Sequence, residues 1–156
     1  MKTTLFCLAS LLMICADTFA QTATEIDKAA VRKVVEAETH AYLEANAGLM
    51  LAQWSDKPYA ERQHASLTPM LKVPFLKGPT LKPMTESYIK TQKPATYTRR
   101  QIDYESHVSG DMAWVTYTQE DVNEAGAVFK KERNLRVLER EATGWKIVVL
   151  SFQPME

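Results

Sequence analysis

Residues 127–152, with the sequence AVFKKERNLRVLEREATGWKIVVLSF, predict two β-strands joined by a tight turn, and they decide the fold class. Both strands are rich in β-branched and aromatic residues, and the turn falls at residues 141–144. Alternate side chains of a strand point to opposite faces of a sheet, so pairing across the turn sorts them into two sets. Both sets are too apolar for either face to be left in water. We therefore expect a sheet that is covered on both sides.

The register of this hairpin separates a mixed face from an apolar face. We expect Arg140 to lie opposite Trp145, and Glu139 opposite Lys146 as a cross-strand ion pair. The mixed face would carry Glu132, Asn134, Arg136, Leu138, Trp145, Ile147, Val149 and Ser151. The apolar face would carry Leu135, Val137, Val148, Leu150 and Phe152. We assign the mixed face to the helices and a pocket, and the apolar face to contact with another subunit.

Two further strands precede the hairpin. The sequences SGDMAWVTYTQED at residues 109–121 and TYTRRQIDYESHV at residues 96–108 have a similar composition, and the short connections SG and VNEAG favour antiparallel neighbours. Extending the same pairing adds Met112, Trp114 and Thr116 to the face of Arg136, and Ala113, Val115 and Tyr117 to the opposite face. A shift of one residue in a connecting loop would reverse these assignments.

The amino-terminal half of the chain predicts helices. Apolar residues recur at helical spacing through residues 30–45, and Thr24 followed three residues later by Asp27 is typical of a helix start. Asn46 is a plausible stop signal, and the proline-rich middle of the chain predicts irregular structure with one short strand and a helix near residues 81–91. Helices followed by a run of strands indicate an α+β fold, a curved antiparallel sheet with its helices on one face.

One acidic residue interrupts the apolar stripe of the long helix. Glu38 follows Val35 by three residues and precedes Tyr42 by four, which places its carboxylate on that stripe. The side chain either reaches water at the edge of the stripe or faces an internal cavity and pairs with a cation, because an unpaired buried carboxylate is costly. The sequence alone leaves both alternatives for Glu38 open.

The first twenty residues, MKTTLFCLASLLMICADTFA, are typical of a secretory signal peptide. An apolar run from Leu5 to Ala16 follows Lys2, and small-residue cleavage chemistry ends at Ala20. The run is too short to cross a bilayer, which takes about 20 apolar residues. We therefore expect residues 1–20 to be removed, and residues 21–156 to form one secreted or periplasmic domain.

The cysteine content and the net charge limit the disulfides and the classes of binding partner that we expect. Cys7 and Cys15 both lie in the predicted signal peptide, so the mature chain would form no disulfide. The 19 basic and 19 acidic residues balance, and they still balance once Lys2 and Asp17 are removed. A neutral chain without a basic run disfavours binding to nucleic acid or to an anionic membrane surface. The expected partner is a small molecule or a protein.

The strand GDMAWVTYTQ followed by NLRVLEREATGWKIVVLSF resembles the nuclear transport factor 2-like (NTF2-like) superfamily, especially the SnoaL-like proteins and the association domain of calcium/calmodulin-dependent kinase. The helical YLEANAG and the position of Trp54 in LAQWSD agree with this resemblance. It covers roughly residues 25–153, although residues 57–93 match only in length and in ESYIK. The resemblance implies a cone-shaped fold, in which a long helix packs across a strongly curved antiparallel sheet with a pocket between them.

The resemblance also implies roles for particular residues. In the kinase association domain the arginine of the corresponding strand points into the pocket, and this position is Arg136 here. Arg136 would then face Glu38, and its guanidinium could bind either this carboxylate or that of a ligand. The family frequently dimerises through the outer face of the sheet, which would use Val137, Val148, Leu150 and Phe152.

The enzymes of the superfamily have characteristic catalytic residues that can be sought in this sequence. Its ketosteroid isomerases use a helix tyrosine and an aspartate followed by proline, whereas Ala41 takes the tyrosine position here and the sequence contains no Asp-Pro. Its dehydratases and cyclases rely on histidine and aspartate, which makes His64 a candidate general base beside Glu38. No residues have metal-ligand or phosphate-loop spacing, so we expect neither a metal nor a cofactor.

The leading hypothesis is a homodimeric domain that binds a small organic molecule, anionic if Arg136 holds it. The residues expected to line its pocket are Glu38, Tyr42, Tyr59, Trp114 and Arg136. One alternative is a lyase or isomerase with Glu38 or His64 as its base. The other is a structural module for homo-oligomerisation.

Overall fold

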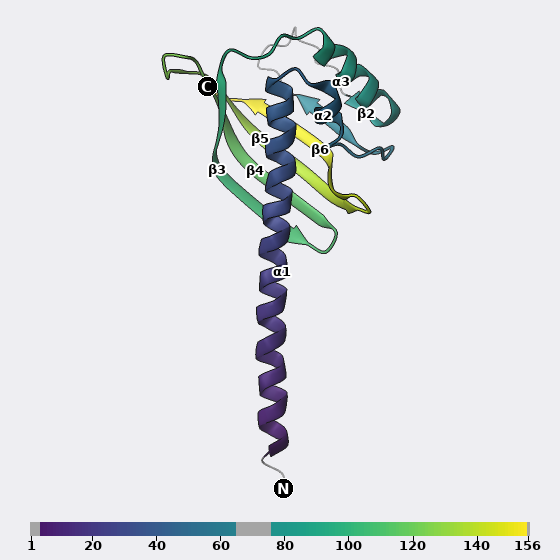
Figure 1. Ribbon diagram of the computed structural model, residues 1–156, viewed down its shortest axis with the longest axis vertical. Helices are drawn as coiled ribbons and strands as arrows, with labels where there is room; N and C mark the ends of the chain where they lie inside the picture. The colour runs from purple at the N-terminus through teal and green to yellow at the C-terminus, as the bar shows by residue number, and fades with distance from the viewer. Residues whose placement is uncertain (1–3, 65–75, 156) are drawn as a thin grey trace.

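The computed structural model describes residues 4–64 and 76–155, with side chains over residues 24–63 and 76–155. A long helix lies across one face of a six-stranded sheet, and its amino-terminal half extends beyond the sheet (Figure 1). Two shorter helices lie near the carboxyl-terminal end of the long one (Figure 1). The fold is therefore α+β, as the sequence predicts.

The long helix, α1 (Thr4–Leu43), is longer than predicted. Thr24 lies inside α1 and does not begin it, because no helix-breaking glycine or proline interrupts the residues before it and the helix propagates through them. The predicted cleavage after Ala20 falls within α1 and stays a prediction. Among the residues that the structure describes, no helix is both long and apolar enough to cross a membrane.

Two short helices follow. In α2 (Ala47–Leu51), the side chain of Asn46 caps the first turn by accepting a hydrogen bond from the backbone of Leu49 at 3.1 Å. A 3₁₀ turn, η1 (Gly78–Thr80), leads into α3 (Leu81–Lys90), which confirms the helix predicted in this part of the chain. Trp54, just after α2, is a buried core residue.

The sheet has the strand order β2-β1-β6-β5-β4-β3. Its six strands are β1 (Glu61–His64), β2 (Leu76–Lys77), β3 (Thr98–Ser109), β4 (Met112–Val122), β5 (Val128–Glu141) and β6 (Gly144–Pro154). The four long strands are antiparallel, as predicted, but β1 pairs in parallel with β6, so the sheet is mixed. One short strand was expected in this part of the chain, but its position and its parallel pairing were not predicted, because only four residues form it between segments rich in proline and polar residues.

The last hairpin keeps the predicted register only near its turn. Arg140 lies opposite Trp145, and Glu139 opposite Lys146, but a β-bulge at Val148 then shifts the pairing. Arg136 consequently lies opposite Leu150, which is buried in the core together with the helix side chains. Leu150 and Phe152 therefore lie on the inner face, which α1 covers. Their assignment to the outer face was wrong.

A second bulge reverses the predicted faces of β4. Val122 pairs with Val128, but Asp121 pairs with Lys130, so Phe129 is an extra residue in β5. The shift of one position places Val115 opposite Arg136 and moves Trp114 to the outer face. The inner-face core is formed by Val31 and Val35 of α1 with Ala113, Val115, Tyr117, Leu138, Trp145, Ile147 and Leu150.

Candidate functional site

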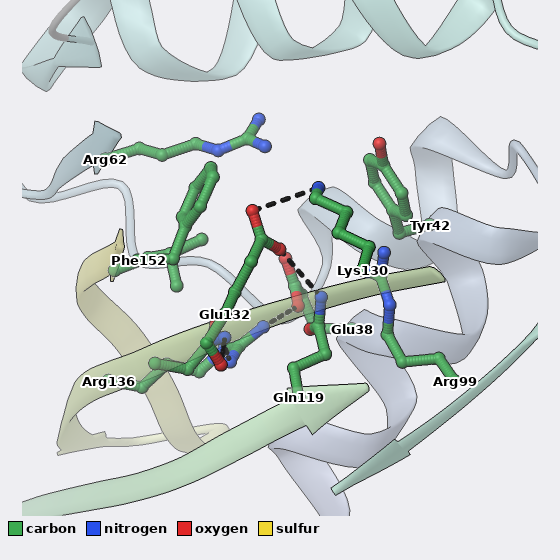
Figure 2. A pocket seen from close by; sticks show the side chains of 11 residues that line it. Glu38, Tyr42, Arg62, Arg99, Gln119, Lys130, Glu132, Arg136 and Phe152 are labelled. Atoms are coloured by element: carbon green, nitrogen blue, oxygen red, sulfur yellow. Dashed lines mark hydrogen bonds and ion pairs between the residues drawn. The ribbon is translucent and has the colours of Figure 1, made fainter. Parts of the chain in front are cut away.

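A pocket lies between α1 and the inner face of the sheet, with a volume of about 60 Å³ (Figure 2). Space on this scale accommodates a few water molecules or a ligand of a few heavy atoms. The side chains that line it come from α1 and five of the strands, and they are Glu38, Tyr42, Arg62, Arg99, Gln119, Lys130, Glu132, Asn134, Arg136, Leu150 and Phe152. Most of them are polar or charged.

The innermost ion pair joins the helix to the sheet. Arg136 Nη2 donates a hydrogen bond to Glu38 Oε2 at 2.7 Å, and the two side chains are 4% and 3% exposed (Figure 2). The guanidinium also lies 5.2 Å from the centre of the Tyr117 ring. The pairing of Glu38 with Arg136 is confirmed, and the alternative that Glu38 reaches water is wrong.

A second pair stands on the same face of β5. Lys130 Nζ lies 2.9 Å from Glu132 Oε1, and Gln119 Nε2 donates to Glu132 Oε2 at 2.9 Å (Figure 2). Glu132 is buried, whereas the Lys130 side chain is 47% exposed. The carboxylate is thus fixed from the neighbouring strand β4, and the lysine reaches it from the solvent side.

A third pair closes the side of the pocket next to β3. Arg99 donates to Asp121 through Nε at 2.7 Å and through Nη2 at 3.0 Å, a bidentate arrangement. Burial disfavours the charge of Arg99, but the hydrogen bonds to Asp121 outweigh it and raise the pKa of the guanidinium. The guanidinium lies 5.1 Å from the centre of the Tyr42 ring. This pair is therefore a fixed part of the wall.

Tyr42 contributes a neutral hydroxyl to the pocket. Burial raises the pKa of its phenol far above the ordinary value, and a hydrogen bond with Tyr88 raises it further. The group therefore remains protonated at any physiological pH. A protonated phenol can donate one hydrogen bond and accept another.

Arg62 differs from the other three cations. Its guanidinium extends from β1 over the ring of Phe152, 5.6 Å from the ring centre, toward the middle of the pocket (Figure 2). Within residues 24–63 and 76–155 it forms no ion pair. Among the described side chains, three of the four cations that line the pocket are each paired with a carboxylate, and the positive charge of Arg62 is left uncompensated.

Three of the five predicted ligand-binding residues meet here. Glu38, Tyr42 and Arg136 line the pocket, whereas Tyr59 and Trp114 do not. Tyr59 lies on an exposed loop and donates its hydroxyl to Glu139 Oε2 at 2.5 Å. Trp114 is 40% exposed on the outer face because of the bulge in β5.

The candidate base His64 belongs to β1 by its backbone, and its side chain lies outside the described residues. No histidine is among the described side chains that line the pocket. In the part of the chain whose side chains are described, no group of three or more histidine and acidic residues could hold a metal ion.

Sequence reasoning placed Glu132 on the face assigned to the pocket but did not name it as a site residue, and it missed Arg62, Arg99 and Lys130. A signal for Lys130 and Glu132 was present, since polar residues alternate along β5 as Lys130, Glu132, Asn134 and Arg136, the pattern of a strand with one polar face. Arg62 had no such signal, because the short strand expected in the middle of the chain had no predicted position or partner strand.

No family model matches the sequence, and no curated protein matches it. Solved structures do match, over most of their lengths. An NTF2-like protein with a cystatin-like fold from Novosphingobium aromaticivorans is 13% identical, with a TM-score of 0.71 and 90% of each chain covered. The chain has the NTF2-like cone fold.

Two other solved structures show how widely this fold is used. A ketosteroid isomerase-like protein from Erwinia carotovora atroseptica is 20% identical, with a TM-score of 0.60 over 82% of this chain and 95% of that one. The association domain of CaMKII from C. elegans is 13% identical, with a TM-score of 0.64 over 83% and 97% of the chains. At these identities the likeness concerns the fold of the NTF2-like domain and does not assign an activity.

Proposed function

We propose that this NTF2-like domain binds a small anionic organic molecule in the pocket beneath α1. The observation that carries the proposal is Arg62, a guanidinium that points into the pocket without a carboxylate partner in the described part of the chain. Arginine recognises carboxylates through two parallel hydrogen bonds, so a ligand carboxylate would complete its coordination. Arg136 is already occupied by Glu38 and holds the wall of the pocket in place.

The other lining groups fit a polar ligand. The Tyr42 hydroxyl and the amides of Gln119 and Asn134 offer neutral donors and acceptors beside the cations. Phe152 and Leu150 supply the apolar part of the wall. The small volume of the pocket favours short carboxylic acids over steroid-sized compounds.

Binding of short carboxylates tests this proposal. Acetate, propionate, lactate and pyruvate would be screened by thermal shift, and the best of them titrated by calorimetry. Arg62→Gln should weaken its binding by about tenfold to a hundredfold, the value of a charge-assisted hydrogen bond. The matched control is Arg133→Gln, because Arg133 is exposed on the outer face and donates to Thr116 there. Equal affinity in the wild type and Arg62→Gln would refute the role of Arg62.

A second function, self-association through the outer face, is favoured by exposed apolar side chains. Met112 is 45% exposed, Trp114 40% and Leu135 37%, and they lie on adjacent strands of the same face. Of the four residues predicted for this interface, Val137 lies there half-buried, Val148 is buried at the bulge, and the other two face α1. We infer that a second copy of the chain covers Trp114 and its neighbours.

We also propose that the domain acts outside the cytoplasm, secreted or in the periplasm. Support comes from the charged start, apolar run and small-residue cleavage signal of residues 1–20. The intact mass of the protein from its native host measures this directly. A mass that retains residues 1–20 would contradict export by cleavage.

A further inference from the structure

Among the described side chains, the charges of the pocket form three ion pairs and leave one cation, Arg62, without a carboxylate partner. Arg136 is held by Glu38 at 2.7 Å, Arg99 by Asp121 at 2.7 Å, and Lys130 by Glu132 at 2.9 Å. Arg62 has only the Phe152 ring against its guanidinium among the described residues. One negative charge from a ligand would therefore balance the site.

We propose that the pocket selects ligands with a single negative charge, monocarboxylates, and that Glu132 is the residue that sets this limit. The inference rests on the proposed function. A monocarboxylate neutralises the charge of Arg62, whereas a dicarboxylate brings a second charge that finds no unpaired cation among the described side chains. That second charge would lie beside the Glu132 carboxylate, and repulsion between like charges disfavours it.

Glu132 sets the limit on ligand charge because its ion pair with Lys130 is held less firmly than the other two ion pairs. The Glu38 and Arg136 side chains are both almost fully buried beneath α1, and Arg99 is fixed to Asp121 by two hydrogen bonds. Lys130, by contrast, is 47% exposed and makes one contact with Glu132. Removing the charge of Glu132 would release Lys130 as a second free cation at the same pocket.

The substitution Glu132→Gln changes charge with little change in shape. The buried carboxylate accepts a hydrogen bond from Gln119 at 2.9 Å, and the amide oxygen of a glutamine can accept the same bond. The variant pocket would then carry two uncompensated positive charges. It should prefer a ligand with two negative charges.

Propionate and malonate are suitable probes, because they have the same number of carbons and differ by one carboxylate. Calorimetry at pH 7.5 and constant ionic strength should show the wild type binding propionate at least tenfold more tightly than malonate. In Glu132→Gln the order should reverse, with malonate gaining at least tenfold in affinity. The double variant Lys130→Gln with Glu132→Gln restores the original charge and should restore the preference for propionate.

Glu120→Gln is the matched control. Glu120 is also a buried glutamate held by a lysine of β5, with Lys131 and Arg100 each at 2.7 Å, but it lies on the outer face. Its replacement changes the charge of the protein by the same amount and should leave the preference for propionate unchanged. An equal gain of malonate affinity in Glu120→Gln would mean that overall charge decides, and would overturn the proposal.

The remaining outcomes separate this inference from the function on which it rests. If neither probe binds the wild type or any variant, the proposed anion binding fails and the charge limit fails with it. If the wild type binds malonate as tightly as propionate, anion binding stands and the charge limit is overturned, whether or not the variants fold. If the wild type prefers propionate and folded Glu132→Gln does the same, Glu132 does not set the limit.

Discussion

Each face of the sheet carries a buried glutamate that is paired with cations, but the surroundings of the two glutamates differ. Glu132 on the inner face and Glu120 on the outer face come from paired strands, are both almost fully buried, and are each held by a lysine of β5. On the inner face, α1 closes over the charges and leaves a small pocket. On the outer face, no helix of the described residues covers the charges, and the Arg100 partner of Glu120 is 58% exposed. The covering helix therefore decides whether a charged strand pair lines a pocket or lies on an open surface.

Because water has little access to the inner ion pairs, they matter more for stability than the ion pairs on the outer face. Glu38 and Arg136 are both withdrawn from water, whereas the Arg100 partner of Glu120 is 58% exposed. A buried charge that loses its partner cannot be compensated by water, but an exposed one can. Substitutions on the inner face should therefore cost more than their counterparts on the outer face.

The largest expected effect is that of Arg136→Met. It leaves the Glu38 carboxylate without its partner beneath α1, so the free energy of unfolding should fall by about 3–5 kcal/mol in urea denaturation. The double variant Glu38→Gln with Arg136→Met should recover much of the loss. On the outer face, Arg133→Met should cost less than about 1 kcal/mol. Similar losses for the two arginines would remove the distinction between the faces.

The sequence predicted the strands well because their periodicity is local. All four long strands were found within a few residues of their ends, and Arg136 was correctly placed toward the helix. What failed was the sorting of side chains into faces beyond the bulges at Phe129 and Val148. Each bulge inserts one residue, and one residue reverses every side chain that follows. Trp114 and Leu150 were misplaced for this reason alone.

The candidate site was predictable only where it depends on the helix and the last hairpin. Glu38 could be found because a charge on an apolar helical stripe needs a partner, and Arg136 supplied it. Arg62 could not be found, because a four-residue strand that pairs in parallel depends on contacts with β6, which are distant in sequence. The pocket's charge balance therefore became visible only in three dimensions.

A smaller effect is expected from Trp114→Asp on the outer face. If a second copy covers this side chain, a charge there should weaken self-association at least tenfold, or about 1.4 kcal/mol. Light scattering over a range of concentrations measures the change, and circular dichroism should show that the fold is intact. Ala142→Asp, in the exposed β5–β6 turn, adds the same charge and should leave the mass unchanged. A wild type that stays monomeric at high concentration would contradict the interface.

The smallest effect concerns the pH dependence of stability at Glu120. Hydrogen bonds from Lys131 and then Arg100 lower the pKa of this carboxyl below its ordinary value of 4.5, although burial opposes them. The unfolded chain therefore binds a proton at higher pH than the folded one does. The stability contributed by Glu120 is complete above the ordinary pKa and is lost as pH falls through the folded pKa.

Urea denaturation between pH 7 and pH 3 should show this as a difference in slope. The free energy of unfolding should fall less steeply with acid in Glu120→Gln than in the wild type, because the variant has no carboxyl to protonate. Arg100→Gln removes the second of the two hydrogen-bond partners and should give an intermediate slope. Parallel curves for the wild type and Glu120→Gln would show that the ionised Glu120 carboxylate adds nothing to stability on the outer face.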